Sequence, residues 1–461
     1  MIPHALCTAL WAALAGLALG LPPAAQALAA ADVPVIADDQ VLVNGSLSLP
    51  QLIDFALAHN PEIAASTYDG RAAAARSQAA RGARLPRISI EGGYTRYGDD
   101  LRLTAARYNG EPGVFGDNIL TADLVLRLPL YTGGRLTAEM RAAELLEASA
   151  GQRLARSKGD LVYNVSSLYY GQLAQMRLIE SLAFSESALA GQLKRVNALI
   201  AERKAAKVDA LRTEVKLADI RQRLLRERNS LAVQRQALLN LMGAGQAGDD
   251  FALAGDLQPP AREARNFETL VASALERRPD ARAARTEFEA QAARVEAARA
   301  GYRPTLNLVG AMGNRRMFGP SQHPAGLSDN DDTARLGISF EMPLYDGGRT
   351  GARVDEENAK LGALRERLTR LQLQIRLDVE TAYTNLASAL ERQASTDKVI
   401  DLANESLRIE QEKYALSRGT AQDVLDAQSA LLEAQTNHIR ALADANAAAA
   451  QLALATGENL P

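Results

Sequence analysis

The residue types that most often carry enzyme or metal chemistry are few and scattered in this 461-residue chain. The only cysteine is Cys7, and the four histidines are His4, His59, His323 and His438. No Cys or His pair has the spacing of a metal site, and the sequence contains no glycine-rich phosphate loop and no Gly-x-Ser-x-Gly motif. We therefore expect no catalytic residues, no metal and no cofactor, and we predict that the protein is not an enzyme.

Two carboxylates do have a spacing that could act on ions. Asp423 and Asp426 are three residues apart and so share one face of a helix, where their charges repel mildly. They follow a polar turn at 418–422, and Asp209 follows a similar turn at 202–208. Because the first turn of a helix favours carboxylates, helix capping explains Asp209 and Asp423 at least as well as a function does.

The composition favours a protein built from long helices. Apolar residues make up 47% of the chain and are spread along it, which argues against disorder, while aromatic residues make up only 5%. Abundant alanine with few aromatics is typical of long helices that pack closely. The 52 basic and 55 acidic residues leave a net charge of −3, so charge gives no reason to expect a nucleic-acid partner.

The N-terminal segment 1–27 has the features of a signal peptide. It contains no Asp, Glu, Lys or Arg, and an apolar run from Leu6 to Leu21 is followed by two prolines and by Ala25-Gln26-Ala27, a small-x-small cleavage site. Ala27-Leu28-Ala29 is an alternative site. A membrane anchor is a weaker alternative, because about sixteen apolar residues are few for a span. We predict a signal peptide at 1–27, an extended segment at 28–47, and no membrane-spanning helix later in the chain.

The rest of the chain is one unit written twice. Pro61, which follows an apolar run, recurs as Pro279 in the same context. The segment Pro-Leu-Tyr-Thr-Gly-Gly-Arg at 129–135 recurs as Pro-Leu-Tyr-Asp-Gly-Gly-Arg at 343–349. The predicted domains are therefore a first repeat at 48–243, a linker at 244–265, a second repeat at 266–457 and a tail at 458–461.

Each repeat is expected to begin with two helices. A capping box at Ser48–Gln51 opens a short helix in the first repeat, and Asn266 caps its counterpart in the second. Pro61 and Pro279 end these short helices and start alanine- and arginine-rich helices of about 24 residues, because proline fits the first turn of a helix but not its interior.

Two strands follow in each repeat. Apolar and polar residues alternate in 121–130 and in 334–344, and less clearly in 88–97 and 305–316. This period, over about ten residues per strand, is that of a membrane-spanning β-strand. An ordinary half-buried sheet is the commoner cause of such a pattern, but it fits poorly between helices too long for a compact fold. We predict long exposed loops, rich in Gly, Pro, Asp and Asn, between the paired strands at 98–120 and 317–333.

Each repeat then continues into a very long helix. Residues 132–200 contain no proline, and about 69 helical residues would span roughly 100 Å. Residues 346–417 are similar, and their leucines, spaced by three and four residues, indicate coiled-coil packing. A polar turn and a shorter returning helix follow. Stacked end to end, the returning helix of about 36 residues and the preceding one of about 24 residues would match the long helix.

The four strands of one chain cannot seal themselves from lipid. The smallest membrane barrels have about eight strands, and an open sheet edge in lipid leaves backbone groups unpaired at several kcal/mol each. If the strands span a membrane, the chain must therefore oligomerise, and its helices would form a hollow cylinder that continues the barrel.

Three motifs together resemble the TolC-type outer-membrane efflux family. They are the two Pro-Leu-Tyr-x-Gly-Gly-Arg strand-to-helix turns, the x-Pro junctions of both repeats, and the stretch from Tyr414 to Gln428. The resemblance covers nearly all of the chain after the signal peptide. It implies an α+β membrane protein in which each duplicated unit has two β-strands plus long coiled-coil helices. Three copies would form a trimeric 12-stranded β-barrel continued by a periplasmic α-helical barrel.

The resemblance also implies a function. The protein would be a passive channel, or exit duct, in the cell outer membrane of a Gram-negative bacterium, serving a tripartite efflux or type I secretion system. It would act as a homotrimer in outer-membrane lipid, with a periplasmic adaptor (membrane fusion) protein and an inner-membrane pump or ABC transporter as partners. The alternatives are a structural coiled-coil envelope protein, which would not need the strands, and a periplasmic adaptor without a pore. The cargo, whether drug, metal, dye or protein, stays open.

The resemblance assigns roles to residues at the helix tips. Residues matching Asp423 and Asp426 line the narrow periplasmic entrance, and residues matching Asp209 and Tyr414 hold it closed. Arg418 joins this gate as the neighbour of Gly419, which stands where the best-known family member has an arginine. The adaptor-docking region matches Lys204, Ala205, Ala206, Lys207, Val208, Arg418, Gly419, Thr420 and Ala421. The strand-to-helix turns contain Pro129, Gly133, Gly134, Pro343, Gly347 and Gly348. A plain solvated turn is the alternative at both tips.

Overall fold

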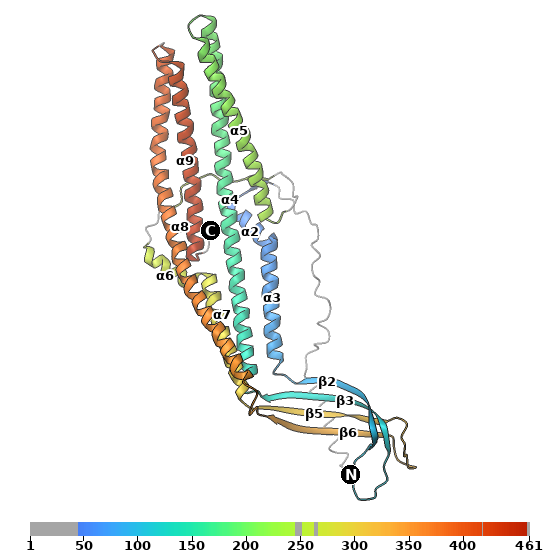
Figure 1. The fold of residues 1–461 in the computed structure, drawn as a ribbon. Helices are drawn as coiled ribbons and strands as arrows, with labels where there is room; N and C mark the ends of the chain where they lie inside the picture. Colours follow the sequence, from blue (N-terminus) through green and yellow to red (C-terminus); the bar gives the residue numbers. More distant parts are fainter. Residues whose placement is uncertain (1–44, 245–250, 262–265, 417, 459–461) are drawn as a thin grey trace.

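The computed structural model describes residues 45–244, 251–261, 266–416 and 418–458. The predicted signal peptide at 1–27, most of the predicted extended segment and the end of the predicted tail lie outside the described residues. Within them, a column of long helices ends in a four-stranded sheet that leaves the column at an angle (Figure 1). No helix of the described ranges combines the length and the apolar composition that crossing a membrane requires.

Two helices, α4 and α8, run nearly the whole length of the column. Each contains 67 residues, which corresponds to about 100 Å at 1.5 Å per residue. Each turns back at its tip into a shorter helix, and further short helices occupy the remaining length (Figure 1). The first repeat contains α2 (Leu49–His59), α3 (Pro61–Gly82), α4 (Arg135–Ala201) and α5 (Lys207–Leu241). The second contains α6 (Phe267–Arg277), α7 (Pro279–Arg299), α8 (Arg349–Ala415) and α9 (Ala421–Thr456).

The bounds of the elements confirm the duplication. Helices α3 and α7 both begin at a proline, and in both repeats that proline directly follows the cap of a short helix. Helices α4 and α8 both begin at an arginine, end at an alanine and have the same length. The predicted unit of two strands and long helices, written twice, is therefore the architecture of the chain.

Caps hold the interrupted helices end to end. The Asn60 Oδ1 atom accepts hydrogen bonds from the backbone N–H groups of Glu62 (2.8 Å) and Ile63 (3.2 Å) and so caps α3. The Nδ2 atom of the same buried residue donates to the Leu241 carbonyl at the end of α5 (2.7 Å). One side chain thus joins α5 to α3, which confirms the end-to-end stacking expected from the helix lengths.

The sheet is antiparallel, with the strand order β2–β3–β5–β6. Its strands are β2 (Arg87–Arg102), β3 (Phe115–Tyr131), β5 (Thr305–Met317) and β6 (Asn330–Glu341). They contain 16, 17, 13 and 12 residues, so the expected length of about ten was too short. The hairpin ends continue as strand into segments predicted as loops. Charged neighbours such as Asp99 and Asp100 occupy both faces there, so the sequence shows no alternation.

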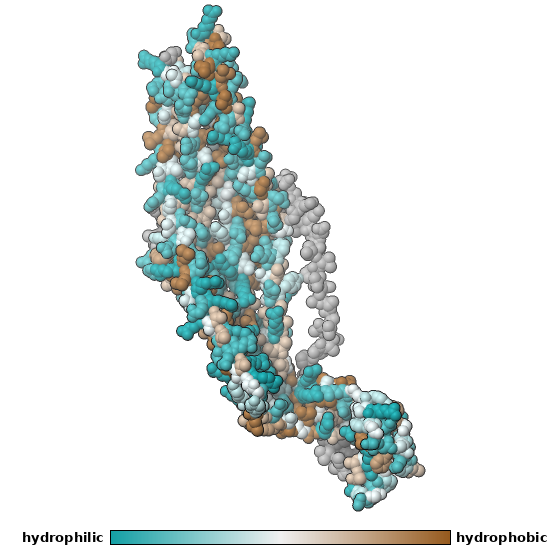
Figure 2. Space-filling model, in the orientation of Figure 1, coloured by the Kyte–Doolittle hydropathy of each residue, from teal (hydrophilic) through white to brown (hydrophobic). Residues whose placement is uncertain are grey.

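One face of the sheet is apolar, with exposed side chains on β2, β3 and β6 and partly exposed ones on β5. The register pairs Ile90 with Leu124 and Leu124 with Met312, so these side chains share a face. The opposite face is polar and carries an ion pair between Arg127 and Glu91 (Nη1–Oε1 2.6 Å). Figure 2 shows apolar residues over the part of the sheet beside the helices and more hydrophilic ones at its far end. The large exposed residues of the apolar face include Ile88, Ile90, Tyr94, Leu120, Leu124, Leu336, Ile338 and Phe340.

The described part of the linker crosses helices of both repeats. Its strand β4 (Phe251–Leu253) pairs in parallel with β1 (Gly45–Leu47). The Tyr169 hydroxyl of α4 donates to the Ala254 carbonyl, and the Asn446 side chain of α9 donates to another linker carbonyl (2.8 Å). The segment predicted as a linker therefore ties α4 of the first repeat to α9 of the second.

We predict that Asn60→Ala destabilises the fold more than Asn266→Ala does. Asn60 caps α3 and also satisfies a carbonyl of α5, whereas Asn266 accepts one hydrogen bond, from the Glu268 N–H (2.9 Å), at an exposed helix start. Loss of a cap costs about 1 kcal/mol, and an unsatisfied buried carbonyl adds about 1–3 kcal/mol. Thermal unfolding followed by circular dichroism measures the difference, and equal losses would contradict the joining role of Asn60.

Candidate functional site

The helix tips farthest from the sheet hold most of the residues that the sequence singles out. At the first tip, Arg203 adopts a left-handed conformation (φ 60°), and the Lys204 N–H donates to the Leu199 carbonyl (2.8 Å). At the second tip, the Arg418 N–H donates to the Lys413 carbonyl in the equivalent position (2.8 Å). A left-handed conformation costs a residue other than glycine about 1–2 kcal/mol, so the first tip keeps a strained turn.

The residues predicted to dock an adaptor lie in these two turns. A β-carbon on Gly419 would lie 3.1 Å from the Lys413 β-carbon, so the second turn is tight at the position where the family's best-known member has arginine. The neighbouring Arg418 is exposed. Eight predicted positions are exposed or partly exposed, namely Lys204, Ala205, Ala206, Lys207, Val208, Arg418, Gly419 and Thr420, whereas Ala421 is buried.

Asp423 forms a capping box with Thr420 at the start of α9. The Thr420 hydroxyl and backbone N–H donate to the Asp423 Oδ2 atom (2.7 and 2.9 Å), and the Asp423 N–H donates back to the hydroxyl (3.2 Å). The hydrogen bond from the Thr420 side chain, followed by the one from its backbone, holds the pKa of Asp423 below its ordinary value. Asp423 therefore caps α9, which is one of the two roles expected from its sequence position.

Asp426 lies one helical turn farther along and plays no part in that cap. Its carboxylate is exposed, and its Oδ1 atom accepts a hydrogen bond from Gln422 of the same helix (2.8 Å). In the described part of the chain no cation pairs with it. Its charge is thus available to ions in solution, which distinguishes Asp426 from Asp423.

Tyr414 lies near the end of α8, at the second tip. Its hydroxyl is buried and has no hydrogen-bond partner within the described residues. Burial, and after it the carboxylate of Asp209, raises the pKa of Tyr414, while Arg195 acts in the opposite direction. The Tyr414 hydroxyl and the Asp209 carboxylate form no hydrogen bond with each other within the described residues.

The strand-to-helix turns have the conformations that their glycines allow. A β-carbon on Gly133 would come within 2.9 Å of a backbone carbonyl of the second repeat, and Arg303 donates to the Gly133 carbonyl (2.8 Å). The first turn is thus packed directly against the second repeat. Pro129 lies at a register irregularity of β3, and Pro343 follows the end of β6. All four glycines of these turns have positive φ, between 66° and 91°, namely Gly133, Gly134, Gly347 and Gly348.

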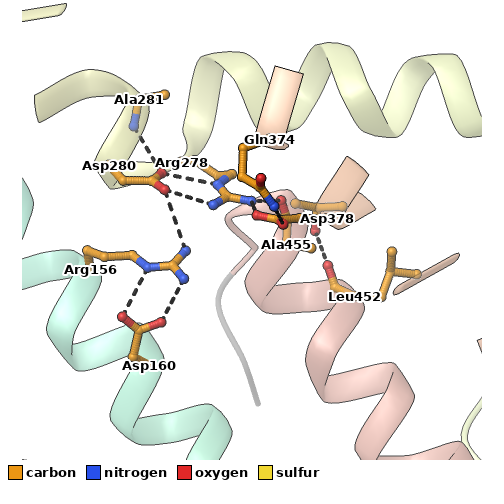
Figure 3. A network of polar contacts seen from close by, with 10 residues as sticks. Arg156, Asp160, Arg278, Asp280, Ala281, Gln374, Asp378, Leu452 and Ala455 are labelled. Atoms are coloured by element: carbon orange, nitrogen blue, oxygen red, sulfur yellow. Dashed lines mark hydrogen bonds and ion pairs between the residues drawn. The ribbon is translucent and has the colours of Figure 1, made fainter. Parts of the chain in front are cut away.

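A buried ion-pair network, which sequence reasoning missed, surrounds the junction of α6 and α7 (Figure 3). Arg278 occupies the position equivalent to Asn60 and is only 3% exposed. Its guanidinium contacts Asp280 (Nη2–Oδ2 2.7 Å) and Asp378 of α8 (Nη1–Oδ2 3.0 Å). It also donates to the Ala455 carbonyl at the end of α9 (3.4 Å). The second repeat thus joins its interrupted helices with a charge where the first uses an amide.

The same network reaches the first repeat. Asp280 lies 3.9 Å from Arg156 of α4, which also pairs with Asp160 (Nη2–Oδ1 2.8 Å; Figure 3). Burial alone would raise the pKa of Asp280, but the hydrogen bonds and charge of Arg278 hold it below its ordinary value. The signal in the sequence was the change of Asn60 to Arg278 between repeats, with an aspartate two residues later.

We predict that this network stabilises the fold at neutral pH and fails in acid. Because the folded-state pKa of Asp280 lies below the ordinary 3.8, its contribution is complete above that value and is lost as the pH falls through the folded-state pKa. Asp280→Asn should lower the unfolding temperature at neutral pH and flatten its decline at acidic pH. The control is Glu289→Gln, at an exposed position of the same helix. If the unfolding temperature of Asp280→Asn declined in acid as steeply as that of the unmodified protein, Asp280 would not be the group responsible.

Comparisons with known proteins agree with this geometry. The family described as "Outer membrane efflux protein" matches residues 52–244 and 270–458. The chain is 25% identical to protein CyaE of Bordetella pertussis, over 99% of this chain and 95% of CyaE. It is 22% identical to the outer membrane protein TolC of Escherichia coli, over 84% of this chain and 78% of TolC.

The fold is shared with a solved outer-membrane structure. The crystal structure of the outer membrane protein VceC from Vibrio cholerae matches with a TM-score of 0.73 at 19% identity, over 89% of this chain and 96% of VceC. The family match spans both repeats and most of the chain. The chain therefore belongs to the outer membrane efflux protein family and has the fold of its TolC-type channels.

Proposed function

We propose that three copies of this chain form a passive, gated exit duct that crosses the outer membrane of a Gram-negative cell and continues through the periplasm. The observation that supports this most is the open sheet. Its edge strands β2 and β6 each pair with one strand among the described residues. Each unpaired edge group in lipid would cost several kcal/mol. Twelve strands from three copies, with β6 of one copy beside β2 of the next, would close a barrel without edges.

The apolar face has the height of a membrane. It extends along β3 from Leu120, opposite Tyr94, to Leu130, next to Tyr131. Ten residues at about 3.3 Å each give about 33 Å, or about 25 Å across the bilayer at a strand tilt of about 40°. Exposed tyrosines at both ends of this band, including Tyr345 at the helix side, suit the two membrane interfaces. A coiled-coil scaffold or a soluble adaptor would expose this apolar face to water, which soluble proteins rarely do.

The tips would form the periplasmic entrance. Around a three-fold axis, Asp423 and Asp426 would give two rings of carboxylates, which attract cations. The closed state would add the missing hydrogen bond between Asp209 and Tyr414. Arg418, which is exposed beside the tight turn at Gly419, would serve this gate from the next position along the chain.

The partners follow from the same arrangement. The turns at 204–208 and 418–421, whose positions other than Ala421 are exposed or partly exposed, would receive a periplasmic adaptor protein, which connects the duct to an inner-membrane pump or ABC transporter. That partner would supply the energy, since a duct of this kind carries cargo without chemistry. We also propose that residues 1–27 are the signal peptide that directs export, and that 48–243 and 266–457 are the two efflux repeats.

We predict that the purified protein raises the conductance of planar lipid bilayers and prefers cations. Asp426→Asn should weaken this preference, because the carboxylate is exposed and, among the residues that the structure describes, has no partner on another helix. Asp423→Asn should weaken both the preference and the stability of the tip, because it also removes a cap. Reversal potentials in a salt gradient measure the selectivity. Unchanged reversal potentials in the double variant would refute the carboxylate rings.

We predict that the protein in detergent is a trimer that resists sodium dodecyl sulfate and separates only on heating. Closing the two sheet edges in each copy explains this resistance, because every backbone pair in the barrel would have to break together. Light scattering of the detergent complex measures the mass. A monomer under conditions that preserve the helical spectrum would contradict the duct.

A further inference from the structure

The two long helices of the chain are covered to very different extents. Helix α4 packs against α3 and α5 of its own repeat and against α7 and α9 of the other. Fourteen of its residues are buried. Helix α8 buries four residues within the described chain, namely Ile375, Val379, Ala382 and Ala389. It lies at the margin of the column, whereas α4 lies inside it (Figure 1). A side of α8 therefore lacks the partners that α4 has.

The contact between α4 and α7 shows which residues cover one side of a long helix. Arg153 of α4 forms an ion pair with Glu287 of α7, and the Ser149 hydroxyl donates to the same carboxylate (3.0 Å). One turn farther, Arg156 lies 3.9 Å from Asp280 (Figure 3). Two arginines three residues apart on α4 thus meet two carboxylates seven residues apart on α7.

The duplication repeats all four charges at positions of α3 and α8 that are exposed within the described residues. Helices α4 and α8 align from their first residues without a gap, so Arg153 and Arg156 correspond to Arg367 and Arg370. Helices α7 and α3 align from their first prolines, so Glu287 and Asp280 correspond to Asp69 and Glu62. The counterparts Arg367, Arg370, Asp69 and Glu62 are all exposed, and none has an ion pair within the described residues.

Small residues are repeated in the same way. Ala283, Ala290 and Ala297 of α7 are buried at heptad spacing. Their counterparts on α3 are exposed, namely Ala65, Ala72 and Ala79. Likewise Ser149, which is fully buried on α4, corresponds to the exposed Ala363 on α8. The α3 and α8 surfaces therefore have both the charges and the small side chains of a close helix contact, but the contact is not made within one chain.

We propose that α8 of one copy packs against α3 of the next in the register of α4 against α7. Arg367 then pairs with the partner's Asp69, and Arg370 pairs with the partner's Glu62. This inference rests on the proposed assembly of several copies and adds its interface and its register. The contact between α4 and α7 inside one chain is the template for both pairs.

Thiol cross-linking tests the register. In a Cys7→Ser background, which has no other cysteine, the pair Asp69→Cys and Arg367→Cys should react with a short bifunctional thiol reagent and yield covalent dimers and trimers. The pair Glu287→Cys and Arg153→Cys should react within one chain and give no covalent dimers or trimers. The pair Asp69→Cys and Arg353→Cys is out of register by about four helical turns, or about 21 Å, and should give no product.

Charge reversal tests the pairing without a reagent. Asp69→Arg or Arg367→Asp alone should lower the temperature at which the assembly separates in detergent, and the two together should restore it. The control is Arg365→Asp, whose counterpart Gly151 faces open space on α4. Its separation temperature should stay unchanged.

The outcomes separate this inference from the proposed duct. If light scattering gives three copies but Asp69 and Arg367 neither cross-link nor rescue each other, the register is wrong and the duct remains. If the protein is a monomer, both proposals fail. Cross-linked trimers together with reciprocal rescue would establish the interface.

Discussion

An unpaired backbone N–H or C=O group has no stable place in hydrocarbon, and this constraint determines the rest of the molecule. A four-stranded sheet with an apolar outer face has two edges that only further strands can satisfy. Because the chain carries its strands in two pairs, one in each repeat, the helices attached to them must follow the same arrangement. The polar inner face, with the ion pair between Arg127 and Glu91, suits a water-filled interior.

In the proposed duct, the helices would have water on both sides and could not rely on a thick apolar core. Their contacts depend on narrow seams of alanine, serine and leucine and on caps at each interruption. The two repeats bridge the break between stacked helices with different side chains. Asn60 satisfies three backbone groups with one neutral side chain, whereas Arg278 joins α6, α7, α8 and α9 through two carboxylates and a carbonyl. A buried charge of this kind is costly to break, because each partner left alone would be desolvated.

Much of this architecture could be predicted from the sequence, because periodicity and proline positions are local signals. Pro61 and Pro279 located two helix breaks, and the two Pro-Leu-Tyr-x-Gly-Gly-Arg motifs located the strand-to-helix turns. The strand ends could not be predicted, because consecutive charged residues such as Asp99 and Asp100 show no alternation. The network around Arg278 was missed because its contacts lie in α4, α8 and α9, which are distant from Arg278 in sequence. The capping role of Asp423 was one of two explanations, and only its hydrogen bonds to Thr420 show that it applies.

The contrast between unbroken and jointed helices has a mechanical consequence. Helices α4 and α8 are unbroken. Any change in the taper of the column toward its tips would therefore have to occur at the junctions where α5 meets α3 and where α9 meets α7. The first of these junctions is held by the neutral side chain of Asn60 and the second by the charged side chain of Arg278, so the two would not yield equally. In a ring of three copies, the two kinds of junction would alternate. Opening of the tips would then follow three-fold symmetry, even though the wall contains six similar units.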